Sequence, residues 1–128
     1  MNILFLCTHN SCRSQMAEGI GNHIYKNTHT FYSAGTEPGV VNQNAVKVME
    51  EIGIDITDNY AKSLSKLAHI QFDLAVTLCD SAKETCPFIS NTKKLIHKGF
   101  PDPSTSEDIE AFRNVRDQIY DYVRSMFE

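Results

Sequence analysis

The sequence predicts one α/β domain, in which a four-stranded parallel sheet is flanked by helices on both faces. Two unbroken apolar runs, Ile3 to Leu6 and Phe72 to Leu78, are typical of strands buried on both sides. Helical and strand patterns alternate along the chain, which favours parallel strands joined by crossover helices. The chain has 128 residues, 41% of them hydrophobic, so we expect a single domain with a proper core over residues 1–128.

The first strand leads through a short polar loop into the first helix. Met16, Ile20 and Ile24 recur every fourth residue and indicate one apolar stripe of that helix. A strand, a short loop and a helix in this order aim backbone N–H groups and the positive end of the helix dipole at an anion. The sequence therefore predicts an anion-binding loop between the first strand and the first helix.

The remaining elements follow in order along the chain. A short strand is expected over Thr30 to Ala34, and then a helix that Asn42 caps and Gly53 ends. The stretch from residue 63 to 69 fits either a helix or an irregular loop. Further elements are expected over residues 80–85 (short helix), 94–97 (weak strand) and 106–127 (last helix).

The predicted loop carries residues suited to nucleophilic attack on a tetrahedral oxyanion. Cys7 ends the first strand, and Arg13 and Ser14 begin the helix. An ordinary cysteine thiol, with a pKa of about 8.5, is only about 3% ionised at neutral pH, so a nucleophilic cysteine needs its anion stabilised. Loop N–H groups and the Ser14 hydroxyl suit that task, and the Arg13 fork suits two oxygens of a phosphate-like ligand. Asn10 tolerates the left-handed backbone that a tight loop requires.

Composition excludes several classes of partner. The formal net charge of −4 argues against a nucleic-acid or anionic-membrane surface. The sequence shows neither a secretory signal nor an apolar stretch long enough to span a bilayer, so we expect a cytoplasmic protein. Four cysteines in that reducing compartment favour chemistry or metal binding over structural disulfides.

A second cysteine follows a strand in the same way as the first. Cys79 comes directly after the Phe72 to Leu78 run, and neighbouring strands lie about 5 Å apart, so Cys7 and Cys79 would meet if their strands are adjacent. Cys86 lies seven residues further on. If the segment between Cys79 and Cys86 is helical, these two cysteines are roughly 10 Å apart, and a disulfide between them requires the segment to unwind.

The run from Cys7 to Arg13, followed by Ser14, resembles the phosphate-binding loop of the low-molecular-weight protein tyrosine phosphatase fold. A longer string is similar to the branch of that fold that contains the thioredoxin-coupled arsenate reductases. Its residues are Cys7, Thr8, His9, Asn10, Ser11, Cys12, Arg13, Ser14, Gln15, Met16, Ala17, Glu18 and Gly19.

The resemblance implies a disulfide relay. Cys7 would attack arsenate held by the loop of Thr8 to Ser14, and Asp102 would act as general acid. Cys79 would then attack Cys7 to release arsenite, and Cys86 would attack Cys79 to form a disulfide that thioredoxin reduces. The resemblance implies no bound flavin, nicotinamide or metal, since thioredoxin supplies the electrons; we expect a monomer, with Cys12 as a bystander.

Some positions depart from the family pattern. Asn10, Glu18 and Ser33 match residues that help to build a potassium site in some of these reductases, but Lys62 stands where an aspartate would complete it. We therefore expect no bound cation at this place. His9 stands where several relatives have glycine.

Two other functions stay open. The first is a phosphatase acting on phosphotyrosine or another phosphomonoester, because Cys7, Arg13 and Asp102 would serve that reaction unchanged. Ser104 and Thr105 argue against it, since tyrosine phosphatases of this fold carry aromatic residues there. The second is a metal or metalloid binder using the four cysteines, although their spacing differs from the close pairs of structural zinc sites.

Overall fold

The computed structural model describes residues 1–78 and 90–127 of the chain. Its sheet consists of β1 (Asn2–Cys7), β2 (Thr30–Gly35), β3 (Leu74–Thr77) and β4 (Leu95–His97), and all neighbouring strands run parallel. The strand order is β2-β1-β3-β4. The predicted four-stranded parallel sheet is therefore confirmed. Strand β1, which ends at Cys7, and strand β3, which lies shortly before Cys79 in the sequence, are neighbours.

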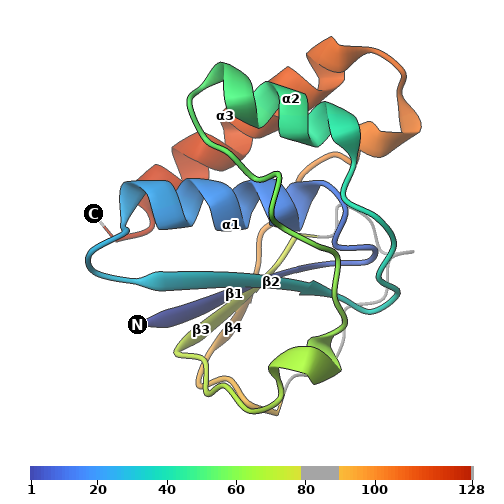
Figure 1. Cartoon of the computed structure of the whole chain (residues 1–128). Helices are drawn as coiled ribbons and strands as arrows, with labels where there is room; N and C mark the ends of the chain where they lie inside the picture. The colour runs from blue at the N-terminus through green and yellow to red at the C-terminus, as the bar shows by residue number, and fades with distance from the viewer. Residues whose placement is uncertain (79–89, 128) are drawn as a thin grey trace.

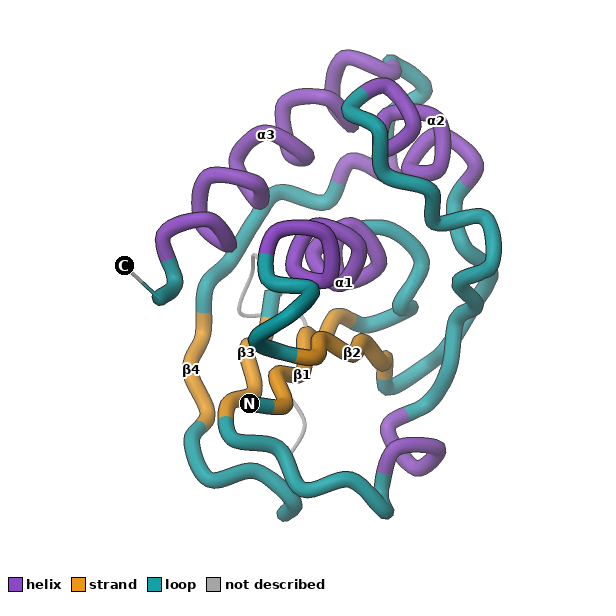
Figure 2. Tube along the Cα trace, turned by 60° about the vertical axis from the view of Figure 1, so that its left-hand side comes forward, coloured by secondary structure: helices purple, strands orange, loops and turns teal. Residues whose placement is uncertain are grey.

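The helices cover the two faces of this sheet unequally. Helices α1 (Arg13–Ile24), α2 (Gln43–Glu51) and α3 (Ile109–Ser125) gather on one face, as the two views of the chain show (Figures 1 and 2). The opposite face carries the short 3-10 helix η1 (Leu64–Leu67). A second 3-10 turn, η2 (Pro103–Thr105), leads into α3.

Strand β1 separates two apolar clusters because both of its faces are buried. Ile3 and Phe5 pack with the three α-helices, whereas Leu4 and Leu6 pack with Leu67 of η1 and its neighbours. All four β1 side chains are at most 1% exposed. The unbroken apolar run is thus explained by helical cover on each side of the strand.

Polar caps set where the helices begin and end. The Asn42 side chain accepts a hydrogen bond from the backbone N–H of Asn44, which confirms the predicted start of α2. Gly53 ends this region with a φ of 79°, a conformation that glycine adopts without strain. Asp108 accepts from the backbone N–H of Glu110, so α3 begins at Ile109 rather than near residue 106.

Two other predicted elements have different bounds in the structure, and a third cannot be compared. The stretch of residues 63–69 forms one short 3-10 turn, between the two alternatives of helix and loop. Strand β3 covers residues 74–77, which is shorter than the predicted apolar run of residues 72–78, because Phe72 forms only an isolated bridge with Thr92. The helix predicted over residues 80–85 lies outside the described residues.

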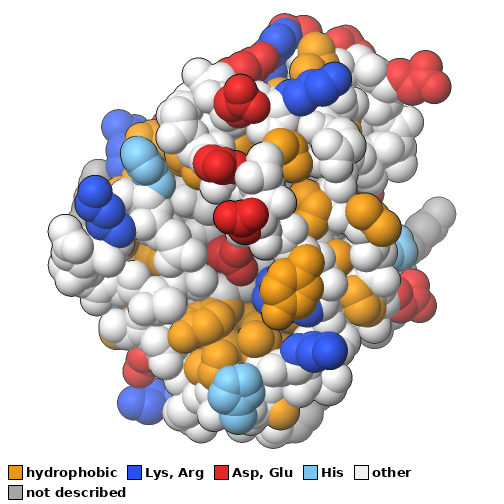
Figure 3. Space-filling view, viewed as in Figure 1, with side chains coloured by type: hydrophobic (Ala, Val, Ile, Leu, Met, Phe, Trp, Pro, Cys, Tyr) orange, Lys and Arg blue, Asp and Glu red, His pale blue; other side chains and the backbone are white. Residues whose placement is uncertain are grey.

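The surface is consistent with the modest negative charge. On the face in Figure 3, acidic side chains lie in a column over the helical layer, with Lys and Arg side chains scattered around them. None of the helices in the described part of the chain is long and apolar enough to cross a bilayer.

Topology places the site at one end of the sheet. The chain passes from β1 to β2 on one side and later returns to β3 on the other side of β1. In open α/β sheets a ligand binds beyond the carboxyl ends of the strands where the order reverses in this way. Cys7 is the last residue of β1, so it lies at that point.

Candidate active site

The loop between β1 and α1 is held by its carbonyl groups. The carbonyl oxygens of Thr8, His9 and Ser11 accept hydrogen bonds of 2.8–3.0 Å from backbone N–H groups of the segment of residues 37–42. In a trans peptide the N–H of the next residue points the opposite way from the carbonyl. The N–H groups that follow these three carbonyls therefore point away from that segment, which is the arrangement of an anion cradle.

Two residues make the tight curvature of this loop possible. Asn10 is the one non-glycine residue of the described chain with a positive φ, at 51°, as its sequence position predicted. Gly35, at the end of β2, lies so close that a Cβ atom there would be 2.6 Å from the Thr8 carbonyl oxygen and 2.9 Å from the Asn10 nitrogen. The loop thus depends on the absence of a side chain at residue 35.

Cys7 lies at the end of β1 and is 6% exposed. Its Sγ atom is 2.9 Å from the Ser14 Oγ, in the first turn of α1. Cys12, the residue before helix α1, makes no side-chain capping hydrogen bond, so the first N–H groups of the helix are not taken by a capping side chain. The thiol therefore faces a hydroxyl and lies near the positive end of a helix.

Arg13 joins the loop to two distant segments. Its Nη1 donates to the carbonyl oxygens of Leu78, at 3.2 Å, and Phe100, at 3.1 Å. Its Nη2 lies 3.7 Å from Asp102 Oδ2. The predicted general acid therefore lies beside the predicted anion-binding arginine, although 89 positions separate them in the sequence.

The two loop cysteines differ in electrostatics. Burial raises the pKa of the Cys12 thiol, and the negative charges of Cys7 and Asp102 add to this effect, while Arg13 opposes it. The raised pKa favours the protonated Cys12 thiol, and the role of Cys12 as a bystander stays a prediction. The buried Thr8 Oγ1 has no hydrogen-bond partner in the described structure.

A family model for low molecular weight phosphotyrosine protein phosphatases matches residues 2–128. The chain belongs to this family.

Its relatives include several arsenate reductases. An arsenate reductase of Halalkalibacterium halodurans is 44% identical over 131 residues, covering 98% of this chain and 94% of that protein. One of Shouchella clausii is 46% identical over 126 residues, covering 91% and 88%. A solved structure described as an arsenate reductase in the phosphate binding state is 30% identical, with a TM-score of 0.87 and coverage of 98% and 95%. The predicted family resemblance is therefore confirmed.

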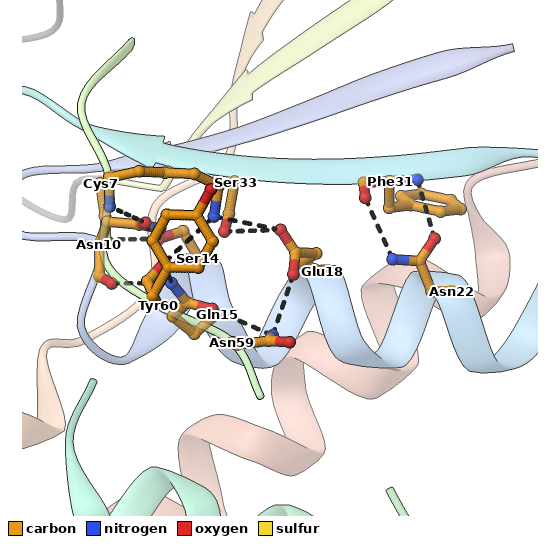
Figure 4. Close-up of polar contacts among 11 residues, drawn as sticks. Cys7, Asn10, Ser14, Gln15, Glu18, Asn22, Phe31, Ser33, Asn59 and Tyr60 are labelled. Atoms are coloured by element: carbon orange, nitrogen blue, oxygen red, sulfur yellow. Dashed lines mark hydrogen bonds and ion pairs between the residues drawn. The ribbon is translucent and has the colours of Figure 1, made fainter. Parts of the chain in front are cut away.

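Behind the loop of this phosphatase-family site lies a polar network that local sequence patterns did not reveal in full. Gln15 Nε2 donates to Asn10 Oδ1 at 3.0 Å and to the Tyr60 carbonyl oxygen at 3.0 Å (Figure 4). Asn59 Nδ2 donates to Gln15 Oε1 and to Glu18 Oε2. No local sequence pattern marks Asn59 as part of the site, because its partner Gln15 lies 44 positions away.

Lys62, which stands where an aspartate would complete the potassium site of some relatives, lies beside Glu18. Its Nζ lies 3.8 Å from Glu18 Oε1, and both side chains are largely buried, with exposures of 9% and 14%. The Ser33 hydroxyl donates to the same Glu18 oxygen at 2.9 Å. Burial raises the pKa of Glu18, while the Lys62 charge and the Ser33 hydrogen bonds lower it.

Cys79 and Cys86, the two other predicted relay cysteines, lie outside the described residues, so their meeting with Cys7 stays a prediction. The structure brings together the other predicted site residues, Cys7, Arg13, Ser14 and Asp102, at one end of the sheet. Within residues 1–78 and 90–127, no group of three His, Cys, Asp or Glu side chains is placed to hold a metal ion.

Proposed function

We propose that the protein is an arsenate reductase that works by a Cys7, Cys79 and Cys86 relay and is regenerated by thioredoxin. Relatives of 44% and 46% identity, matched over nearly their whole length, are arsenate reductases, and the anion loop suits a tetrahedral oxyanion. The thiol chemistry needs the reducing environment of the cytoplasm.

The bond from Arg13 to Leu78 carries this proposal. The Arg13 guanidinium, which would hold the oxyanion, donates to the carbonyl oxygen of the residue that immediately precedes Cys79. The Leu78 N–H in turn donates to the Leu6 carbonyl oxygen at 2.8 Å, next to Cys7. Leu78, the residue before Cys79, is therefore hydrogen-bonded both to the anion-binding arginine and to the residue before Cys7. This proximity supports an attack of Cys79 on Cys7.

The first step would be a displacement at arsenic. The Cys7 thiolate forms a bond to arsenic, and one arsenate oxygen leaves as water after Asp102 supplies a proton. Arg13 and the loop N–H groups balance the oxyanion charge. Arsenic stays in its pentavalent state in this adduct.

Electrons move in the second step. The Cys79 thiolate attacks Cys7 Sγ, the sulfur–arsenic bond breaks, and its electron pair goes to arsenic, which leaves as arsenite. The Cys86 thiolate then attacks Cys79 and frees the Cys7 thiolate. Thioredoxin reduces the resulting disulfide between Cys79 and Cys86 by thiol–disulfide exchange.

A phosphatase is the second candidate, because the chain belongs to a phosphatase family and Cys7, Arg13 and Asp102 suit phosphoryl transfer equally well. The turn that follows Asp102 carries Ser104 and Thr105, which offer no aromatic surface for a phosphotyrosine ring. We therefore expect hydrolysis of small aryl phosphates to be a weak side activity.

One assay separates the two candidates. Thioredoxin-coupled NADPH oxidation with arsenate is measured for the wild type and for Cys79→Ser and Cys86→Ser, alongside hydrolysis of a small aryl phosphate. We expect both substitutions to abolish arsenate turnover while the hydrolysis persists, which shows that the loop is intact. Full arsenate turnover by Cys79→Ser would overturn the relay.

A further inference from the structure

The hydrogen bonds around Asn10 fix the direction in which protons are donated toward Cys7. The Lys62 backbone N–H can only donate, and it does so to Asn10 Oδ1 at 3.0 Å. The amide NH₂ of Asn10 must then face the other way, and Nδ2 donates to Ser14 Oγ at 2.7 Å. Because Ser14 Oγ accepts this bond, its own proton is left to donate to Cys7 Sγ.

Gln15 supports the same direction from a second side. The Tyr60 carbonyl oxygen can only accept, so the NH₂ group of Gln15 faces it and also reaches Asn10 Oδ1. Asn10 Oδ1 thus accepts from two donors, and its orientation is determined by the backbone of the segment Asn59 to Lys62, called the strap below. The strap therefore determines that the Ser14 hydroxyl faces the Cys7 sulfur as a proton donor.

Besides its contacts with Gln15, the strap is fastened to α1 by side chains that meet at Glu18. Asn59 Nδ2 donates to Glu18 Oε2 at 2.9 Å, and Lys62 Nζ lies 3.8 Å from Glu18 Oε1. Lys62 Nζ also donates to the Tyr60 carbonyl oxygen at 3.1 Å, within the strap itself. Figure 4 shows Glu18 pointing toward Ser33 on one side and Asn59 on the other, one helical turn from Ser14.

The two charges of this cluster depend on each other. A carboxylate as buried as Glu18 loses hydration, which is costly unless a cation and hydrogen-bond donors replace the water. Lys62 supplies the cation, and Ser33 and Asn59 supply donors. Without Lys62, Glu18 would be left as an uncompensated buried charge and would take up a proton, and the strap would lose one of its contacts with α1.

We propose that Lys62 and Glu18 are positioning residues for the nucleophile: their buried ion pair holds the strap, and the strap holds the Asn10 amide so that Ser14 donates to the Cys7 sulfur. Neither residue touches the oxyanion. The inference deepens the proposed function, since the nucleophile is the one that would attack arsenate, but it concerns the free enzyme.

The sign of two substitutions separates this mechanism from simple electrostatics. Through space alone, removing the negative Glu18 would favour a thiolate at Cys7, and removing the positive Lys62 would disfavour it. Positioning through the strap predicts that both substitutions lower the thiolate fraction of Cys7, because either change loosens the strap. Asn59→Ala changes a half-buried residue without changing the charge, and it should also lower the thiolate fraction of Cys7.

The test measures alkylation of Cys7 by iodoacetamide in the reduced full-length protein, resolved by peptide mass spectrometry. The ratio of the rate at pH 7 to the rate at pH 9.5 reports the thiolate fraction. We expect Lys62→Met, Glu18→Gln and Asn59→Ala each to lower this ratio about five- to tenfold, as loss of one charge-assisted hydrogen bond would. Lys62→Arg, which keeps the positive charge, should have a ratio at least half that of the wild type.

Lys66→Met is the matched control, because Lys66 is exposed on η1 and its loss changes the net charge equally. The proposal would be overturned by a higher or unchanged ratio in folded Glu18→Gln, or by an unchanged ratio in Asn59→Ala. Circular dichroism establishes whether each variant is folded. If a charge variant does not fold, the result for Asn59→Ala decides the question. The assay contains no arsenate, so it stands even if the protein proves not to reduce arsenate.

Discussion

At the scale of single residues, we propose that the reactivity of Cys7 depends on the hydroxyl that faces it. Ser14 Oγ lies 2.9 Å from the sulfur, and Asn10 directs its proton there. Both residues could be singled out from the sequence, since they stand at fixed offsets in one short loop. Gln15 and Asn59 could not be recognised as parts of the site, because their contacts join segments that only the folded chain brings together.

Replacing Ser14 with alanine tests this contact. We expect Ser14→Ala to lower the rate of Cys7 alkylation at pH 7 about tenfold, because a charge-assisted hydrogen bond to the thiolate is lost, while the rate at pH 9.5 changes little. Peptide mass spectrometry of the alkylated protein gives both rates. Ser65→Ala, at an exposed position, is the control. Equal rates for Ser14→Ala and wild type at pH 7 would show that the hydroxyl does not stabilise the thiolate.

At the scale of elements, the site is shaped by how β2 and α2 meet the loop. The end of β2 lies against the loop at Gly35, and the segment between β2 and α2 binds the loop carbonyls. The sequence predicted these elements and the Asn42 cap, because periodicity and capping are local. It could not predict that all three α-helices share one face, or that residues 64–67 form a 3-10 turn, since tertiary packing decides both.

A methyl group at Gly35 should displace the anion loop. The added Cβ of Gly35→Ala would press on backbone atoms of Thr8 and Asn10, so the loop must shift. We expect phosphate affinity, measured by calorimetry, to fall about tenfold or more, with a stability cost of about 1–3 kcal/mol. Gly39→Ala, whose Cβ would approach only the His9 Cβ at 3.9 Å, should bind phosphate normally. Unaltered binding by Gly35→Ala would refute the close contact.

Helices α2 and α3 are joined by a carboxylate that two arginines bind. Glu51 Oε2 accepts from Arg113 Nη2 at 2.7 Å, and Oε1 accepts from Arg116 Nη1 at 2.8 Å. The Arg113 hydrogen bonds, with a smaller contribution from Arg116, lower the pKa of Glu51 to about 2. Because the folded-state pKa is depressed, the stabilisation is present above the ordinary glutamate pKa and is lost as the pH falls from about 4.5 toward 2.

Glu51→Gln should therefore lower the melting temperature at pH 7, and the difference from wild type should shrink as the pH falls from about 4.5 toward 2. Thermal unfolding followed by circular dichroism between pH 2 and 7 gives this profile. Glu50→Gln removes the same charge from an exposed neighbour that has no ion pair within the described structure. A constant difference across the whole pH range would mean that the ion pairs do not stabilise the helix contact.

At the scale of the whole molecule, the parallel sheet brings together residues that lie far apart in the sequence. Cys7 ends β1, and Arg13 reaches back to Leu78 after β3 and across to Asp102 before η2. The adjacency of β1 and β3 follows from the strand order that the sequence could suggest but not fix. The family match and the arsenate reductase relatives then point to the reaction, and the proposed relay would account for the two later cysteines.

The central claim is that Cys7 and Cys79 exchange electrons with arsenate directly, before any outside thiol takes part. It is tested by a single turnover of reduced Cys86→Ser with excess arsenate and no thioredoxin, followed by arsenite analysis and disulfide mapping. We predict about one arsenite per protein and a disulfide between Cys7 and Cys79. Release of no arsenite, or of arsenite without that disulfide, would contradict the account.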